Sequence, residues 1–213
     1  MKVFLFIFLS FAFAAASFAQ SRSAQDKKVT RVKKPRAHKE TDTVGIVNGQ
    51  VISYADFKSM LAARVRAQIE QSRDSIVTDS EYSGLVDSAW NASIRYILMQ
   101  QEIAKRQLNV SEIEAKNYIL ANPPGFIRQQ FMDSLGRFDS LRWVFSAKDK
   151  RNDDVMAPLV QTVQVQLETN KFLTAIAGDA RTESEKEKRY TAWERHAVQK
   201  ARIVDRRLNF GFY

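Results

Sequence analysis

Apolar residues recur along most of the chain with the spacing of amphipathic helices. After Ser53 they stand three or four positions apart until the pattern fades near Ser72. A second pattern of this kind extends from about Asp79 to about Gln107. Such spacing places the apolar side chains of each segment on one face. The sequence therefore predicts two helices here, and the second is long for a globular protein.

Helix-start signals divide the remainder of the chain. Ser111 and Thr182 each stand three positions before a glutamate, as in a capping box, and Ser53 stands three positions before Asp56. A further helix is predicted from Asp153 or Asp154, with Pro158 in its first turn. Its stretch "VQTVQVQL" alternates locally like a strand, but the length of the surrounding pattern favours a helix.

Two segments at opposite ends of this helical pattern have the character of strands. Val44–Ile52 contains two short aliphatic runs divided by Asn48-Gly49, a dipeptide typical of tight hairpins. The tail Ile203–Phe212 mixes β-branched and aromatic residues. A two-stranded hairpin is at best marginally stable alone. We therefore expect both segments to share one sheet, in a mainly α fold that has several helices and a small sheet.

The first residues have the pattern of a secretory signal peptide. Lys2 precedes the apolar run Val3–Phe18, and the small residues Ser17 and Ala19 suit cleavage before Gln20. Residues 1–19 are therefore predicted to be a cleaved signal peptide, with an uncleaved inner-membrane anchor as the alternative. An exported, basic chain that contains no cysteine indicates the periplasm of a Gram-negative bacterium.

Charge separates the next segment from the predicted folded domain, residues 44–213. The net charge is +9, and much of the excess lies between Arg22 and Lys39. Residues 20–43 contain few large apolar side chains, so they are predicted to be a disordered linker. Contact of this linker with anionic lipid headgroups is the alternative. Export argues against nucleic acid as a partner.

No catalytic or metal-binding pattern is found in the sequence. The chain has no cysteine, and His38 and His196 are its only histidines, each without ligands at metal-binding spacing. No serine stands in a nucleophile motif, and there is no glycine-rich phosphate loop. The sequence therefore predicts no metal or cofactor, and it favours a binding role over an enzyme.

One segment, residues 126–145, is dense in aromatic residues, and we call it the aromatic arm. Pro123-Pro124 precedes it, and Gly136 is predicted to be a turn between two short helices. For every ring in it, burial in the core is the alternative to exposure at the surface. As a group the aromatic residues could present apolar surface to extended peptides, with Arg128, Arg137 and Arg142 attracting acidic ones. The predicted peptide-binding residues are Phe126, Phe131, Phe138, Trp143 and Phe145.

The order of three segments resembles a known family. The segments are "VGIVNGQVISYADF", "LMQQEIAKRQLNVSEIEAKNYI" and "PPGFIRQQFMDSLGRFDSLRWVF". In this order they resemble the N-terminal domain of SurA-type and PpiD-type periplasmic chaperones, over about Val44 to Phe145. The resemblance implies a helical chaperone domain that binds unfolded polypeptides, outer-membrane proteins among them, without ATP.

Many members of that family also carry a parvulin-type prolyl isomerase domain, which is rich in glycine and has active-site histidines. This chain has only seven glycines and two histidines, and nothing after Phe145 has the required strand pattern. The expected function is therefore a holdase and not an isomerase. The alternatives are an isomerase-family protein with a divergent or missing catalytic domain, and an envelope scaffold tethered near a membrane.

Overall fold

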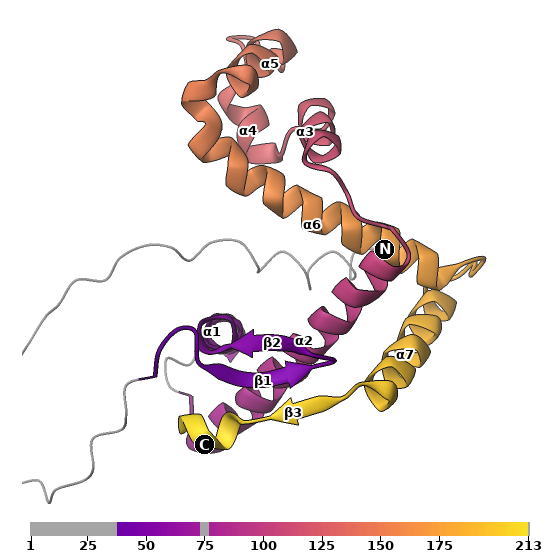
Figure 1. Ribbon diagram of the computed structural model, residues 1–213. Coiled ribbons are helices and arrows are strands. Elements are labelled where there is room, and N and C mark those ends of the chain that lie inside the picture. Colours follow the sequence, from indigo (N-terminus) through magenta and orange to yellow (C-terminus); the bar gives the residue numbers. More distant parts are fainter. Residues whose placement is uncertain (1–37, 73–76, 213) are drawn as a thin grey trace, which may run out of the picture. The chain divides into compact units, whose positions relative to one another are not determined.

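A computed structural model describes residues 38–72 and 77–212 of the chain, and it confirms a mainly helical fold with a small antiparallel sheet (Figure 1). The chain divides into two compact units. Unit 1 contains the residues up to Ile97 together with those from Lys200 onward, and unit 2 contains Leu98–Gln199. The predicted signal peptide and most of the predicted linker lie outside the described residues.

The sheet of unit 1 joins the two ends of the described chain. Its strands are β1 (Thr43–Val47), β2 (Gln50–Ser53) and β3 (Ile203–Asp205), in the order β2-β1-β3, with both pairs antiparallel. Asn48 and Gly49 adopt positive φ angles of 50° and 88° in the β1–β2 turn. The Asn48 side chain also accepts a hydrogen bond of 2.8 Å from the Arg202 amide. The predicted pairing of the two ends is confirmed.

The C-terminal tail is a strand for only three residues, so the predicted strand Ile203–Phe212 is too long. The chain turns after β3 into the 3-10 helix η3 (Arg207–Phe210). The Asp205 carboxylate accepts a hydrogen bond of 2.9 Å from the Arg207 amide and so fixes this turn. The aromatic residues that suggested a longer strand pack as rings instead, with Phe212 lying 4.8 Å from Phe57 between centroids.

Two helices complete unit 1, α1 (Tyr54–Ser72) and the first part of α2 (Asp79–Lys105). The Ser53 hydroxyl accepts a hydrogen bond of 3.1 Å from the Asp56 amide, which confirms the predicted helix start. Helix α1 packs against β1 and β2. The fully buried side chains of this unit's core include Val44, Val47, Phe57 and Val86.

Residues 38–42, which the sequence predicts to be linker, pack against the helices α1 and η3 within unit 1. The Asp42 carbonyl accepts a hydrogen bond of 2.7 Å from the Tyr54 amide at the start of α1. The His38 ring lies 4.5 Å from the Phe210 ring and 5.5 Å from the Tyr54 ring. His38 is therefore half-buried, whereas the composition of its neighbours indicates a solvated residue.

Unit 2 is built from a contiguous stretch of chain. Helix α2 ends in it, and the unit's other α-helices are α3 (Glu112–Ala121), α4 (Gly125–Gln130), α5 (Ser140–Lys148), α6 (Asp153–Ala177) and α7 (Glu183–Lys200). The Ser111 and Thr182 hydroxyls accept hydrogen bonds of 3.1 and 3.2 Å from the Glu114 and Glu185 amides, which confirms both caps. Helix α6 confirms the helical interpretation of "VQTVQVQL", although Pro158 lies beyond its first turn.

Helix α6 organises two clusters of buried side chains in unit 2. The smaller cluster joins Met99 and Ile103 of α2 to Phe172 of α6, with Tyr190 and Trp193 of α7 packed against it. The larger cluster joins Val110, directly before α3, to buried residues of α3, α4, α5 and α6: Ala115, Ile119, Ile127, Trp143, Met156, Val160 and Val163.

Two side chains of α6 hold the backbone of Val110, directly before the start of α3. Val110 donates its amide hydrogen to Glu168 Oε1 at 3.1 Å, and its carbonyl accepts from Gln164 Nε2 at 2.6 Å. Because both polar groups of this buried residue are paired, the connection between α2 and α3 is fixed against α6. Helix α3 is thereby positioned to support the short helices α4 and α5.

Candidate functional site

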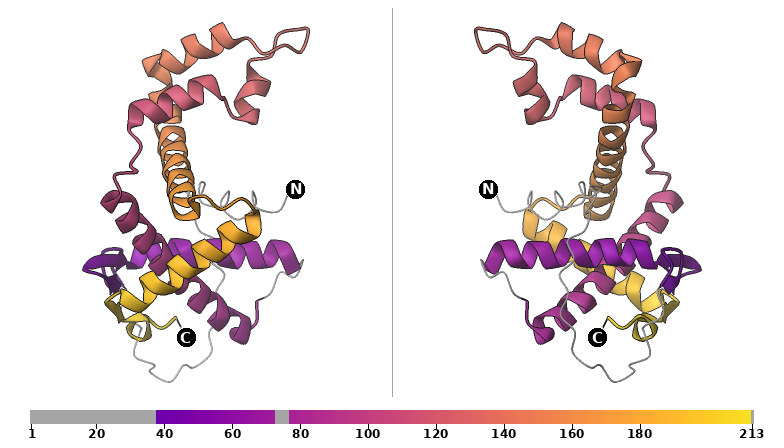
Figure 2. Two further views of the ribbon diagram at one scale, coloured as in Figure 1. Left: turned by 90° about the vertical axis from the view of Figure 1, so that its right-hand side faces the viewer. Right: turned by 90° about the vertical axis from the view of Figure 1, so that its left-hand side faces the viewer.

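The aromatic arm consists of α4, a tight hairpin and α5. Met132 and Phe138 form an isolated antiparallel bridge, and Gly136 adopts a φ of 73° in the turn between them. The turn predicted at Gly136 between two short helices is confirmed, and the short hairpin is an addition. Figure 2 shows the loop projecting from the ends of the two helices.

Two aspartates fix the shape of the arm. Asp133 Oδ1 accepts hydrogen bonds of 2.9 Å from the amides of Leu135 and Arg137 and so closes the turn. The hydrogen bond from the Arg137 amide is the main reason why the pKa of Asp133 lies below its usual value. Asp139 Oδ1 accepts a hydrogen bond of 2.9 Å from the Arg142 amide and caps α5.

The structure places the five predicted peptide-binding residues in two environments. Trp143 is only 3% exposed and belongs to the larger cluster of unit 2. Phe131 and Phe138 are half-buried against the same cluster, and the Phe131 ring lies edge-on to Trp143 at 5.4 Å. Phe126 and Phe145 are 59% and 76% exposed. Only the last two therefore offer large ring surface to a partner in this conformation.

Other apolar residues of the arm are exposed beside these two rings. They are Met132, Leu135 and Leu141. Together with Phe126 and Phe145, they give the arm five of the fourteen exposed large apolar residues in the described chain. Leu141 and Phe145 stand four positions apart on α5, so they share one face of that helix. With five such side chains in twenty residues, the arm is the stretch of unit 2 that has the most exposed large apolar residues.

The helical spacing of α5 predicts that Leu141 is exposed, which a search for aromatic residues alone does not find. Trp143 is buried and Ala147, four positions later, is half-buried against the same cluster. Residues offset by two positions from that pair then point away from the core. Leu141 and Phe145 have this offset, so a helical reading of the short segment 140–148 identifies both.

The three arginines of the arm lie close to its own groups. The guanidinium of Arg128 lies 5.4 Å from the centre of the Phe138 ring, and that of Arg142 lies 5.8 Å from the Phe131 ring. Arg137 Nε makes an ion pair of 2.9 Å with Asp133. Two of these cations therefore cover the half-buried rings, and the exposed apolar residues carry no such cover among the contacts described.

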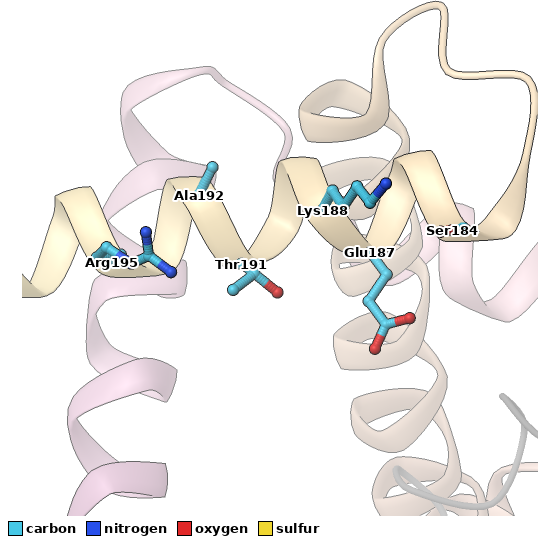
Figure 3. A pocket seen from close by; sticks show the side chains of 6 residues that line it. All are labelled: Ser184, Glu187, Lys188, Thr191, Ala192 and Arg195. Atoms are coloured by element: carbon cyan, nitrogen blue, oxygen red, sulfur yellow. The ribbon is translucent and has the colours of Figure 1, made fainter.

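Two hollows lie elsewhere in unit 2. One lies over α7 and is lined by residues of that helix alone (Figure 3). Another is a shallow, largely apolar depression along α6 beside Leu108. Among the described residues no three histidine, cysteine or acidic side chains are grouped to hold a metal ion. His196 is exposed on α7.

The described part of the chain contains no helix with the length and hydropathy needed to cross a membrane. The apolar run Val3–Phe18, predicted to be a signal peptide, lies outside it.

Comparison with known proteins identifies a family. The model of the SurA-like N-terminal domain matches residues 1–143, which include the sheet hairpin, α1 to α4 and the start of α5. Searches of curated proteins and of solved structures gave no match. The domain is of chaperone type, and its family binds unfolded polypeptides in general. Because the match covers 143 of 213 residues, the chain belongs to the family of SurA-like N-terminal domains.

Proposed function

We propose that this protein is an ATP-independent periplasmic holdase, which binds unfolded polypeptides, outer-membrane proteins among them, through the exposed apolar side chains of the aromatic arm. The observation that carries the proposal is the concentration of five exposed large apolar side chains in residues 126–145. Single exposed apolar residues are ordinary, whereas a contiguous group commonly indicates an interaction site. Membership of the SurA-like family supports the same function.

Apolar burial supplies the binding energy in this proposal. Full burial of one Phe or Leu side chain is worth roughly 1.5–3 kcal/mol before association costs are subtracted. One such contact is too weak to hold a client. Several contacts together hold it, and each is lost and regained quickly. Binding through Phe126, Leu141 and Phe145 would therefore be reversible without nucleotide.

The exposed residues are better candidates for client contact than the buried ones. Replacement of Trp143, Phe131 or Phe138 removes core packing, so a loss of activity in such variants would report on folding. Leu141 and Phe145 can be replaced with little effect on the core because they lie on the outer face of α5. Contacts between a client and the three inward rings stay a prediction from the sequence.

The double variant Leu141→Ser, Phe145→Ser tests the proposed function. We expect it to suppress aggregation of an unfolded outer-membrane protein several-fold less well than the wild type, because two large apolar contacts are lost. Its circular dichroism spectrum and melting curve should stay near those of the wild type.

The matched control is Leu208→Ser, which replaces an equally apolar side chain, 84% exposed, in unit 1. This variant should retain full suppression. A folded double variant with wild-type suppression would refute a role of α5 in client binding. Equal losses in the double variant and the control would show that general surface apolarity, and not the arm, determines activity.

A further inference from the structure

The hairpin of the aromatic arm ends in a short closed turn, and we call its exposed residues 134–137 the tip. The Asp133 amide donates to the Arg137 carbonyl at 2.8 Å, and the Gly136 amide donates to the Asp133 carbonyl at 3.0 Å. Together with the two bonds that the Asp133 carboxylate accepts, four hydrogen bonds fix this turn. Figure 2 shows it projecting from the helices of the arm.

The centre of the tip is apolar. Leu135 is 73% exposed, and Met132, one position before the turn, is also exposed. Turn residues are mostly glycine or small polar residues, each with a role in the turn. Asp133 and Gly136 fill these roles here, because the Asp133 carboxylate closes the turn and Gly136 adopts a φ of 73°. The turn therefore does not require a leucine, and Leu135 instead exposes apolar surface at the projecting end of the arm.

Positive charge accompanies this apolar surface. Arg137 is an exposed residue of the tip itself. The guanidinium groups of Arg128 and Arg142 lie over the two half-buried rings behind it, Phe138 and Phe131. Residues 126–145 contain three arginines and two aspartates, a net charge of +1. Both aspartates direct carboxylate oxygens onto amides of the arm itself. The arm therefore combines an apolar end with cationic side chains beside and behind it.

We propose that the tip of the arm inserts into the interface of an anionic lipid bilayer, with Leu135 below the headgroups and the arginines at the phosphates. Lipid closes around a projecting apolar side chain, whereas a separate ligand buries most of its surface in a hollow. Guanidinium groups bind phosphate oxygens well, and their stems tolerate apolar surroundings. This inference adds a partner to the proposed function and is tested separately from it.

A fluorophore attached to the tip tests this contact. Because the chain has no cysteine, Ser134→Cys provides a unique attachment point beside Leu135. The matched control is Ser184→Cys, which replaces another exposed serine of unit 2, on α7. The fluorophore is one whose emission rises and shifts to shorter wavelength when it leaves water. The basic segment Arg22–Lys39 attracts every variant to anionic vesicles, so the local emission tests the tip and co-sedimentation does not.

The probe is a vesicle of phosphatidylethanolamine and phosphatidylglycerol. We expect emission at position 134 to rise several-fold when vesicles are added, and emission at position 184 to stay unchanged. With Leu135→Ser added to the position-134 variant, half of the rise should need roughly five- to tenfold more lipid, because the burial of one leucine is lost. With Arg137→Gln it should need roughly fivefold more, and this difference should vanish on vesicles of phosphatidylcholine alone.

The outcomes separate this inference from the proposed function. Emission at position 134 that stays constant, or that changes as it does at position 184, would overturn the inference, and so would an unchanged lipid requirement of a folded Leu135→Ser variant. If the tip responds to an unfolded outer-membrane protein and not to vesicles, it is a client surface, and only this inference is wrong. If the tip responds to vesicles but the protein does not suppress aggregation, only the proposed function is wrong. If circular dichroism shows that Leu135→Ser unfolds, the comparison of positions 134 and 184 decides.

Discussion

Gly45 shows how closely single residues determine the packing of unit 1. A Cβ atom added there would lie 2.2 Å from Cη2 of Trp90 and 2.9 Å from the Val204 carbonyl oxygen. Glycine is therefore required for the close approach of the indole to the sheet. The same indole lies 4.9 Å from the guanidinium of Arg207, which also makes an ion pair of 2.7 Å with Asp87.

We predict that Gly45→Ala destabilises the protein by about 1–3 kcal/mol, because the indole or the strand has to move. The control is Gly84→Ala in the exposed part of α2, where an added Cβ meets nothing within 4 Å. That change should raise the free energy of unfolding by roughly 0.5–1 kcal/mol, because alanine is the better helix former. Urea denaturation followed by circular dichroism measures both. Equal stability of Gly45→Ala and the wild type would contradict the packing described for Trp90.

Side-chain direction is predictable from the sequence only where an element is long enough to show a period. Phe57 and Leu61 of α1 and Trp90 and Ile94 of α2 are buried as their helical spacing indicates. In the arm, α4 and α5 have only six and nine residues, so aromatic content dominates the pattern. The roles of Asp133 and Asp139 depend on hydrogen bonds to specific amides, which residue spacing alone does not distinguish from surface charge.

The tail illustrates the same limit at the level of an element. Alternation of apolar residues after Arg202 correctly predicts a strand that pairs with β1. Its length is set by Asp205 and Arg207, whose hydrogen bonds turn the chain into η3 after three strand residues. Local polar contacts thus ended a strand that the apolar pattern alone would have continued to Phe212.

The contact between Asp205 and Arg207 should make unit 1 sensitive to acid. Burial opposes ionisation of the Asp205 carboxyl, but hydrogen bonds from Arg207 outweigh it, so the pKa of Asp205 lies below its ordinary value of 3.8. A carboxyl group whose pKa is lower in the folded state than in the unfolded state stabilises the fold at pH values above its ordinary pKa. This contribution is lost as the pH falls below about 4 and through the lower, folded-state pKa.

The variant Asp205→Asn isolates this effect because it keeps an acceptor for the Arg207 amide and removes the charge. At pH 7 we expect it to be less stable than the wild type by an amount typical of a partly exposed ion pair, about 0.2–1 kcal/mol. The difference should shrink toward zero as the pH is lowered from 5 to 2. A difference that is constant over this range, measured by urea denaturation, would show that the carboxylate charge contributes nothing.

At the scale of the whole molecule, the two units are built from the chain in different ways. Unit 1 is closed by β1 and β3, which lie more than 150 residues apart, and unit 2 is one contiguous stretch. The match to the SurA-like family model extends through residue 143 and so covers most of the arm. The proposed client surface lies in unit 2, on α5 and the hairpin before it.

The central claim is that clients contact the exposed apolar face of α5, and site-specific cross-linking tests it most directly. Because the chain has no cysteine, one introduced cysteine provides a unique attachment point for a photo-activated cross-linker. Phe145→Cys places the cross-linker on the arm, and Leu208→Cys places it at an exposed position in unit 1. The proposal predicts that an unfolded outer-membrane protein is captured several-fold more efficiently at position 145 than at position 208. Equal capture at both positions, or stronger capture at 208, would contradict it.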